Sequence, residues 1–469
     1  MINTDTARYE QFLAELSKEY ELRFPNSQVA QERAQTWLVD GVSHGARQYA
    51  PYAFRITSAS GARAHDIDGH NIVDFWQGHY ANILGHNPAL ICQALIGDLE
   101  AGYGLHTGLL EEREAAYTAT LAKATGAEQV RLTTAGTLAT MYAIMLARAH
   151  TGRKLVLKVS GGWHGANPLA LKGVDRNSHG YDHVDSAGLP NSTGDEVLVT
   201  PFNDTDNLRK LFRSAGDRIA CFIFEPCLGA AGFAPASSAF MSAARELTTH
   251  YGALLILDEV ITGFRFCASG MQRLYGVKPD LATFGKVIGG GMPISAVAGR
   301  AEVMNLVSDK ASAKRVMFNG GTFSSHPLSL LAGQKMLTYL IENEHVIYPR
   351  LQALADELYS GIEKVFAQRG ILARCMGRGN DVLHTGSLGS VYFPRNANFV
   401  PQNAEDFSDP ELSGAPLREQ ALKLGLLLGD VNIVHGLGAI STAHGSAEFN
   451  QVYAACDTFA LRLKATGLA

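Results

Sequence analysis

The sequence predicts an α/β protein, with a large domain built on a mostly parallel sheet and a smaller α+β domain formed by both ends of the chain. Two observations lead to this prediction. From about residue 90 onward, helical stretches alternate with short runs that are apolar on both faces, which is typical of strands covered by helices on either side. Several runs end in a polar residue, as expected at the ligand-binding edge of a parallel sheet. The runs are 154–159, 220–224, 253–257 and 294–298.

The chain of 469 residues is longer than one typical domain, so it is expected to divide. We expect residues 1–75 to form the N-terminal part of the small domain, residues 76–335 the large domain, and residues 336–469 the C-terminal part of the small domain. The first segment contains an N-terminal amphipathic helix followed by a hairpin over residues 62–75. The polar stretch 396–414 is predicted to be a surface insertion.

Composition and charge exclude several classes of function. Hydrophobic residues make up 46% of the chain and charged residues 18%, a balance that excludes disordered and coiled-coil proteins. The net charge is −5 and no Lys/Arg-rich run could follow a nucleic-acid backbone. The chain shows neither a signal-peptide pattern nor a membrane-length apolar stretch, so we expect a cytoplasmic protein without membrane or nucleic-acid partners. Six scattered cysteines favour free thiols over disulfides or zinc.

The most informative pattern is a carboxylate at a strand end followed by a lysine among glycines. The apolar run 254–257 ends at Asp258, and Lys286 lies in a glycine-rich loop further along the chain. Either feature alone has a plain explanation, because a lysine among glycines is also common in solvated turns. Together they match the chemistry of pyridoxal 5'-phosphate (PLP), in which a lysine amine forms a Schiff base with the aldehyde and an acid keeps the pyridine nitrogen protonated.

These motifs resemble those of the class III PLP-dependent aminotransferases of fold type I, a family that includes glutamate-1-semialdehyde aminomutase and related transaminases. The resemblance extends from about Trp37 to the C-terminal end. It implies that Lys286 is the Schiff-base lysine and the base that moves the substrate proton. It also implies that Asp258 pairs with the pyridine nitrogen and that Val260 packs on one face of the ring.

Two further motifs are similar to cofactor-binding segments of this family. The segment 134–139 precedes a helix, and the resemblance implies that Gly136 and Thr137 hold the cofactor phosphate at that helix N-terminus. The segment 160–165 resembles a motif whose aromatic residue, here Trp163, stacks on the pyridine ring. An ordinary core position is the alternative explanation for this tryptophan.

The resemblance also assigns roles to Glu225, Thr322 and Arg47. Glu225 matches an acid close to the cofactor. Thr322 matches a residue that reaches the cofactor phosphate of the neighbouring subunit, which implies a homodimer with shared active sites. Arg47 matches an arginine that binds a substrate carboxylate, a task suited to the planar guanidinium fork.

Two classes of reaction remain open. Residues 165–204 resemble the mobile loop that covers the aminomutase site, yet 434–438 carries no counterpart of the acid that faces the aminomutase substrate. We therefore favour a transaminase that moves an amino group from an α- or β-amino acid to a keto acceptor by a ping-pong Schiff-base mechanism. The alternative is an intramolecular aminomutase of the glutamate-1-semialdehyde type. A protein reduced to binding or regulation would be expected to lack Lys286 or Asp258, and both are present.

Overall fold

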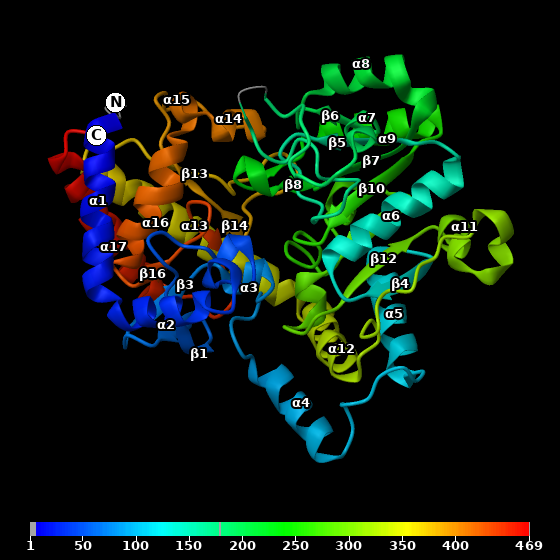
Figure 1. The fold of residues 1–469 in the computed structure, drawn as a ribbon, viewed down its shortest axis with the longest axis horizontal. Coiled ribbons are helices and arrows are strands. Elements are labelled where there is room, and N and C mark those ends of the chain that lie inside the picture. The colour runs from blue at the N-terminus through cyan, green and yellow to red at the C-terminus, as the bar shows by residue number, and fades with distance from the viewer. Residues whose placement is uncertain (1–5, 178–179, 469) are drawn as a thin grey trace.

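The computed structural model describes residues 6–177 and 180–468. Its larger half is built on a seven-stranded sheet in the order β4-β12-β11-β10-β7-β5-β6 (Figure 1). In that order the strands are β4 (Gln129–Thr133), β12 (Ser295–Gly299), β11 (Leu281–Phe284), β10 (Leu254–Glu259), β7 (Ile219–Phe224), β5 (Leu155–Val159) and β6 (Val197–Thr200). Only β12 pairs antiparallel with its two neighbours, so the sheet is mostly parallel, as predicted.

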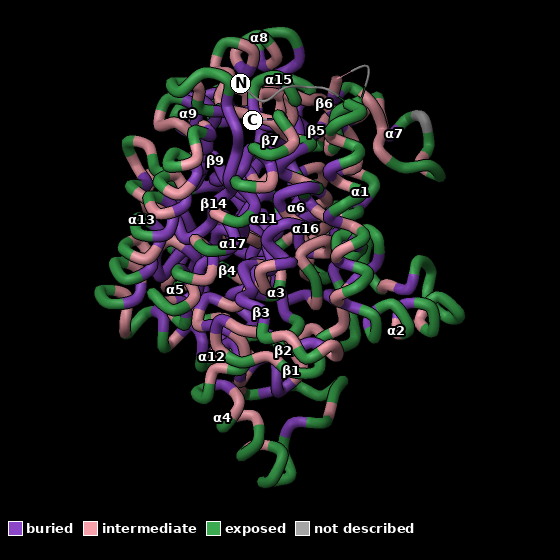
Figure 2. The backbone as a smooth tube through the Cα atoms, turned by 90° about the vertical axis from the view of Figure 1, so that its left-hand side faces the viewer, coloured by how far each residue is buried: buried purple, intermediate pink, exposed green. Residues whose placement is uncertain are grey.

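Helices cover both faces of this sheet, and the alternation of side chains along the strands explains how. In β7, Cys221 and Ile223 pack with α6 (Gly136–Thr151) on one face. Phe222 and Phe224 point the other way and pack with the helices α8 (Thr205–Ala215) and α9 (Ser238–Tyr251). Because every side chain of the strand is buried, the run is apolar throughout (Figure 2).

The smaller half contains a four-stranded sheet in the order β1-β2-β3-β16. Its strands are β1 (Ile56–Ser60), β2 (Arg63–Asp66), β3 (Asn71–Asp74) and β16 (Val431–Asn432). The predicted hairpin is formed by β2 and β3, and β16 pairs parallel with β3, so segments from the two ends of the chain share one sheet. The helices of this half are α1 (Thr6–Arg23), α2 (Pro25–Gln35), α13 (Glu344–Gln368), α16 (Lys423–Leu427) and α17 (Ser446–Ala465).

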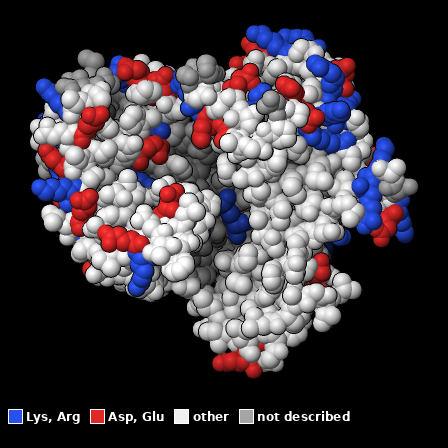
Figure 3. Space-filling model, viewed as in Figure 1, with Lys and Arg blue, Asp and Glu red and all other residues white. Residues whose placement is uncertain are grey.

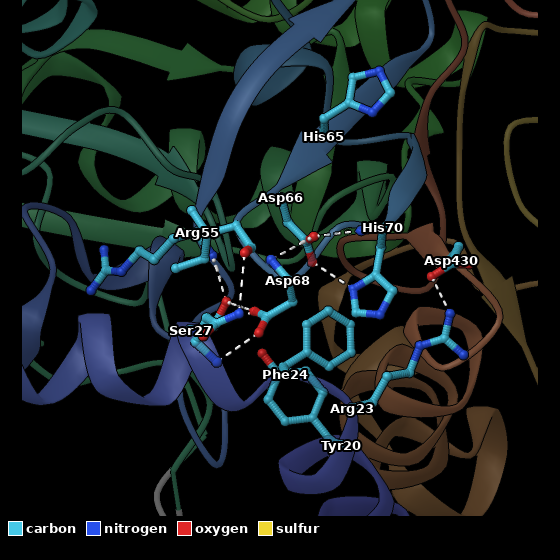
Figure 4. A network of polar contacts seen from close by, with 12 residues as sticks. Tyr20, Arg23, Phe24, Ser27, Arg55, His65, Asp66, Asp68, His70 and Asp430 are labelled. Atoms are coloured by element: carbon cyan, nitrogen blue, oxygen red, sulfur yellow. Dashed lines mark hydrogen bonds and ion pairs between the residues drawn. The ribbon is translucent and has the colours of Figure 1, made fainter.

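Carboxylates of the hairpin turn fasten the N-terminal helices to this sheet (Figure 4). Asp68 accepts hydrogen bonds from the backbone N–H groups of Asn26 and Ser27 at 2.6 and 3.0 Å, at the start of α2. Asp66 holds the turn itself, because its carboxylate accepts from the backbone of Asp68 at 3.0 Å and contacts His70 Nδ1 at 2.7 Å. An anion at a helix N-terminus is favoured by the helix dipole as well as by the hydrogen bonds.

The remaining helices lie between and around the two sheets. They are α3 (Gln77–Tyr80), α4 (Ala89–Glu100), α5 (Glu112–Thr125), α7 (Asn191–Asp195), α10 (Gln272–Tyr275), α11 (Ala301–Met304), α12 (Pro327–Glu342), α14 (Ala404–Ser408) and α15 (Pro410–Ser413). Short two-residue strands complete the fold: β8 (Cys227–Leu228), β9 (Ala234–Pro235), β13 (Arg374–Cys375), β14 (Leu388–Gly389), β15 (Val391–Tyr392) and β17 (Gly438–Ala439).

Among the described residues, no helix is both long and apolar enough to cross a membrane. All six cysteines are free, as predicted, and five of them are buried.

The prediction that residues 396–414 form a surface insertion is wrong in part. Ala404 and Phe407 of α14 are buried. Ala404 lies so close to Gly161 that a Cβ atom at Gly161 would come within 2.5 Å of the alanine Cβ. The insertion therefore packs against the 160–165 motif. Because most of its residues are polar, the sequence did not indicate that Ala404 and Phe407 are buried.

Candidate active site

The candidate site lies at the carboxyl edge of the large sheet, where β10 and β11 end side by side. The register of these parallel strands pairs Asp258 with Thr283. Lys286 begins the short 3-10 turn that follows β11. The sheet thus brings together the acid and the lysine that are separated in the sequence.

Three donors hold the Asp258 carboxylate, which is 3% exposed. His164 Nδ1 lies 2.7 Å from Oδ2, while the Thr283 hydroxyl and the Val260 N–H reach Oδ1 at 2.9 and 3.1 Å. Burial lowers the pKa of His164. With the carboxylate as acceptor, Nδ1 carries the proton of this neutral ring. Asp258 is therefore fixed in orientation at the base of the site.

Two lysines lie near this edge, Lys158 buried and Lys286 partly buried, and their surroundings differ. Burial lowers the pKa of Lys286, although the charges of Asp258 and Glu225 oppose the effect. Burial also lowers the pKa of Lys158 to about 8. Lys158 Nζ donates to the carbonyls of Ala170 and Lys172 at 3.1 and 2.8 Å, whereas no described residue accepts a hydrogen bond from Lys286 Nζ. Of the two, Lys286 has the amine available for chemistry.

Glu225 follows β7 and supports the backbone at Trp163. Its Oε1 accepts the Trp163 N–H at 2.9 Å. Burial and the nearby Asp258 charge raise the pKa of Glu225 to about 7. Trp163 is 46% exposed, which excludes the core position considered above and leaves the residue accessible to a ligand.

The N-terminus of α6 offers backbone groups for an anion. The first N–H groups of a helix have no partner within it, and Ala135, which precedes Gly136, supplies no side-chain cap. Space here is tight: a Cβ atom at Gly136 would lie 2.9 Å from Val260 Cγ1, and one at Gly165 would lie 2.3 Å from Thr137 Oγ1. Only glycine fits at these two positions.

These features fit PLP. The available amine of Lys286, the fixed acid Asp258, the open indole and the helix N-terminus correspond to the aldehyde, pyridine nitrogen, ring face and phosphate of the cofactor. The buried Nε2 of His164 has no hydrogen-bond partner among the described residues, so the ring can serve Asp258 alone. No group of His, Cys, Asp or Glu in the described part of the chain is arranged to hold a metal ion.

The sequence motifs gave no indication of α3, which carries His79 and Tyr80 towards the site. Four consecutive residues, Gln77–Tyr80, have positive φ, a strained conformation for the three that are not glycine. Asp74 holds the turn by accepting from the Trp76 and Gln77 N–H groups at 3.0 and 2.9 Å.

His79 lies near both Lys286 and Arg47, because the charges of both residues act on its ring. Burial, reinforced by nearby positive groups, lowers the pKa of His79 to about 4. In order of effect, those groups belong to His44, Lys286, Arg47 and His435. Arg47 is exposed, and its guanidinium donates to the Ser43 hydroxyl at 3.1 Å. Arg47, the predicted carboxylate-binding arginine, therefore lies near His79, whose pKa the charge of Lys286 also lowers.

The sequence indicated no acid near residues 434–438, and the structure corrects this. Glu419, from a separate segment, contacts His435 Nδ1 at 3.2 Å and accepts from Arg418 Nε at 2.8 Å. These partners lower the pKa of Glu419 to about 2 despite its burial. The charges of Glu419 and Glu225 both act on Tyr80. An acid is present on this side of the site, but it is already paired.

Thr322 is exposed and makes no hydrogen bond with the described residues of segment 134–139 of its own chain. Its carbonyl accepts from the Thr107 hydroxyl at 2.9 Å. The neighbouring Gly321 faces Thr134, since a Cβ atom there would lie 3.4 Å from Thr134 Oγ1. The Thr322 loop thus lies against the segment that follows α4.

Comparisons with known proteins agree with this geometry. A family model described as aminotransferase class-III matches residues 44–397. The glutamate-1-semialdehyde 2,1-aminomutase of Thermoplasma acidophilum is 36% identical over 341 residues, which cover 72% of this chain and 79% of that protein. An ω-transaminase from Sphaerobacter thermophilus superposes with a TM-score of 0.82 at 31% identity, covering 94% of this chain and 98% of that one.

A β-phenylalanine aminotransferase from Variovorax paradoxus also superposes with a TM-score of 0.82, at 28% identity and over 96% of this chain and 97% of that one. The relatives therefore include both transaminases and aminomutases, as the sequence resemblance implied. The family match and the extent of these similarities show that the chain belongs to the class III aminotransferases, PLP-dependent enzymes of fold type I.

Proposed function

We propose that this protein is a transaminase that moves an amino group from a carboxylate-bearing α- or β-amino acid to a keto acceptor. The observation that carries the proposal is the available Lys286 amine beside the fixed Asp258 carboxylate. Bound PLP would supply an aldehyde that accepts the amino group and a ring that withdraws electrons from the reacting carbon.

Each residue around the bound cofactor would have its own role, set by where it lies in the site. Lys286 would hold the cofactor through its aldehyde carbon and would move the proton of the reacting carbon. Asp258 would hold a proton on the pyridine nitrogen, and His164 and Thr283 keep the oxygens of Asp258 in place. Trp163 and Val260 would contact the ring of the bound cofactor.

The phosphate and the substrate would be held at opposite ends of the site. The N–H groups of Gly136 and Thr137 bind the phosphate, which the helix dipole also favours. Arg47 binds the substrate carboxylate through two parallel hydrogen bonds. Glu225 keeps the backbone of Trp163 in position.

Transamination is favoured over aminomutation by the state of Glu419. Both oxygens of this carboxylate already have a partner, Arg418 on Oε1 and His435 on Oε2, so it is less available to a substrate amine than an unpaired acid would be. Aminomutation remains the second candidate, because the relative from Thermoplasma acidophilum is named as an aminomutase.

We also propose a homodimer with shared active sites. In Figure 1, α4 extends away from the rest of the molecule. This helix and the segment after it expose large apolar side chains, including Leu110 at 98%, and an exposed apolar surface of this kind is typical of a protein interface. The others are Leu90, Ile96, Leu99, Tyr103, Leu105 and Leu109. Because Thr107 contacts the Thr322 loop, a partner covering this segment would lie beside Thr322.

An acceptor-dependence experiment tests the reaction type. The PLP-loaded protein is incubated with a panel of ¹⁵N-labelled amino acids, with and without a keto acid, and the products are followed by mass spectrometry. We expect ¹⁵N in the amino product of the keto acid, and sustained turnover only when the acceptor is present. Sustained isomerisation of one amino compound without an acceptor would contradict the proposal and establish aminomutation.

A further inference from the structure

A cavity of about 550 Å³ lies beside the Lys286 site, within the size range of small-molecule pockets. It is enclosed by segments from both ends of the chain and borders the site at His79. Much of its wall is apolar, with Val42, Phe54, Ile72 and Trp76 among the lining residues. Figure 3 shows a hollow between the two halves of the molecule, with Lys or Arg atoms visible inside it.

Three Lys or Arg side chains line this cavity, and they differ in the hydrogen bonds that they make with the protein. Arg55 donates through one terminal nitrogen to Gln31 Oε1 at 2.5 Å and to the Gly41 carbonyl at 2.7 Å. Arg47 has only the hydroxyl of Ser43 as a hydrogen-bond partner among the described residues.

The third cation, Lys423, is partly buried. Its ammonium lies 3.9 Å from the centre of the Tyr49 ring, which stabilises a charge but accepts no conventional hydrogen bond. Within the described residues no carboxylate lies within ion-pair distance of Lys423.

The acids nearest to these cations already have other hydrogen-bond or ion-pair partners. Glu419, one turn before Lys423, binds Arg418 and His435. Asp74, which also lines the cavity, accepts hydrogen bonds from its own turn and contacts His86 Nε2 at 2.8 Å. The charge of Glu419 acts on Lys423, but no carboxylate is in ion-pair contact with the partly buried ammonium. A ligand with an acidic group would supply that contact, which favours binding of negative charge in the cavity.

We propose that Lys423 is a specificity-determining residue that binds a second acidic group of the substrate, remote from the transferred amine. Arg47 takes the first carboxylate, and the apolar wall packs on the aliphatic chain between the two acids. The substrate class is therefore an amino dicarboxylic acid, or its keto counterpart. This inference rests on the proposed function, since it assigns the substrate of the same site.

A binding experiment that needs no turnover tests the inference. Calorimetry on the PLP-loaded protein compares adipate with hexanoate, two ligands of equal chain length that differ by one carboxylate. A hydrogen bond to a charged group contributes enough to favour adipate by about tenfold or more. The variant Lys423→Met should lose this preference, whereas Lys423→Arg should keep most of it. Lys364→Met, at an exposed position of α13, should behave as the wild type.

Turnover of 2-aminoadipate and norleucine with a keto acceptor then provides the second readout. Lys423→Met should raise KM for 2-aminoadipate by about tenfold and leave KM for norleucine unchanged. Equal affinity of the wild type for both acids, no binding of adipate, or a preference that survives Lys423→Met would overturn the inference. Loss of amino transfer with every donor, while adipate still binds through Lys423, would contradict the proposed function alone.

Discussion

The cofactor side and the substrate side of this site are built in different ways. On the cofactor side, Asp258 is buried in the edge of the large sheet with three donors on its oxygens. On the substrate side, Arg47 and Lys423 come from distant parts of the small half, and neither has a carboxylate within ion-pair distance among the described residues. The acid of the cofactor side is held in place before anything binds, whereas the substrate side presents positive charge to a ligand.

The difference shows which function each side serves. Fixed, fully bonded groups keep the geometry needed for reaction, and their hydrogen bonds need no rearrangement when the cofactor binds. Unpaired cations in a partly apolar cavity discriminate between ligands, because a ligand without the matching acid leaves them unsatisfied. Substitutions on the cofactor side should therefore affect chemistry, and those on the substrate side should affect the choice of substrate.

The largest effect is expected for Lys286→Ala, which removes both the nucleophile and the base. Turnover should fall by several orders of magnitude, while PLP should still bind through Gly136, Thr137 and Asp258. End-point assays of amino transfer with purified, PLP-loaded protein measure the turnover. Lys158→Met serves as the control for loss of a buried amine, and near-normal turnover in Lys286→Ala would refute the assignment.

Asp258→Asn should lower turnover by about a thousandfold, because a neutral amide cannot hold the proton on the pyridine nitrogen. Thr283→Val removes only one of the three donors to the carboxylate and should cost much less. A ranking of kcat in the opposite order would show that Asp258 is not the residue that sets the charge of the cofactor ring.

Glu225 makes the stability of the cofactor-free protein depend on pH. The pKa of Glu225 is raised to about 7 in the folded state, whereas an unfolded glutamate has a pKa of about 4.3. As pH rises between these values, the unfolded state loses its proton first, so the free energy of unfolding falls by up to about 3 kcal/mol.

Urea unfolding at pH 5 and pH 8 measures this loss. Glu225→Gln does not titrate, so its stability should fall by a smaller amount over the same interval. An identical pH dependence in the two proteins would mean that Glu225 has an ordinary pKa in the folded state.

Thr322→Val tests whether the site is shared between subunits. If the hydroxyl reaches the phosphate of a partner's cofactor, PLP affinity should weaken by about 1–3 kcal/mol, as measured by titration of the cofactor-free protein. Thr118→Val, whose hydroxyl bonds its own helix, should leave the affinity unchanged. A fully active monomer in analytical ultracentrifugation would rule out the shared site.

The smallest effect is expected for Arg47→Lys on the substrate side. A lysine keeps the charge but loses the planar fork, so KM for carboxylate substrates should rise by about tenfold while kcat changes less. Steady-state kinetics with a good donor measure both constants. An unchanged KM would place carboxylate recognition elsewhere in the cavity.

The sequence predicted the positions of the cofactor-side residues in the fold better than those of the substrate side, for a physical reason. Asp258 and Lys286 lie at or just after strand ends and Gly136 at a helix start, positions that local patterns indicate, while their roles follow from the family resemblance. Glu419 and Lys423 reach the site only through packing between the two ends of the chain, which no local pattern encodes. The strained turn that carries His79 was missed because Asp74 stabilises it by tertiary contacts against the preference of its residues.

The core of the insertion was missed for a similar reason. Residues 396–414 are mostly polar, and the contact of Ala404 with Gly161 depends on the close approach of two segments far apart in sequence. The predicted apolar runs, in contrast, correspond to β5, β7, β10 and β12, because full burial of a strand leaves a continuous apolar signal.

The most direct test of the central assignment is to locate the lysine that binds PLP. The PLP-loaded protein is reduced with borohydride, digested, and mapped by mass spectrometry for the phosphopyridoxyl group. We expect the label on Lys286, because it follows β11 beside Asp258 and no described residue accepts a hydrogen bond from its amine. Label on Lys158, the buried lysine near this edge, or on any other lysine would contradict the account.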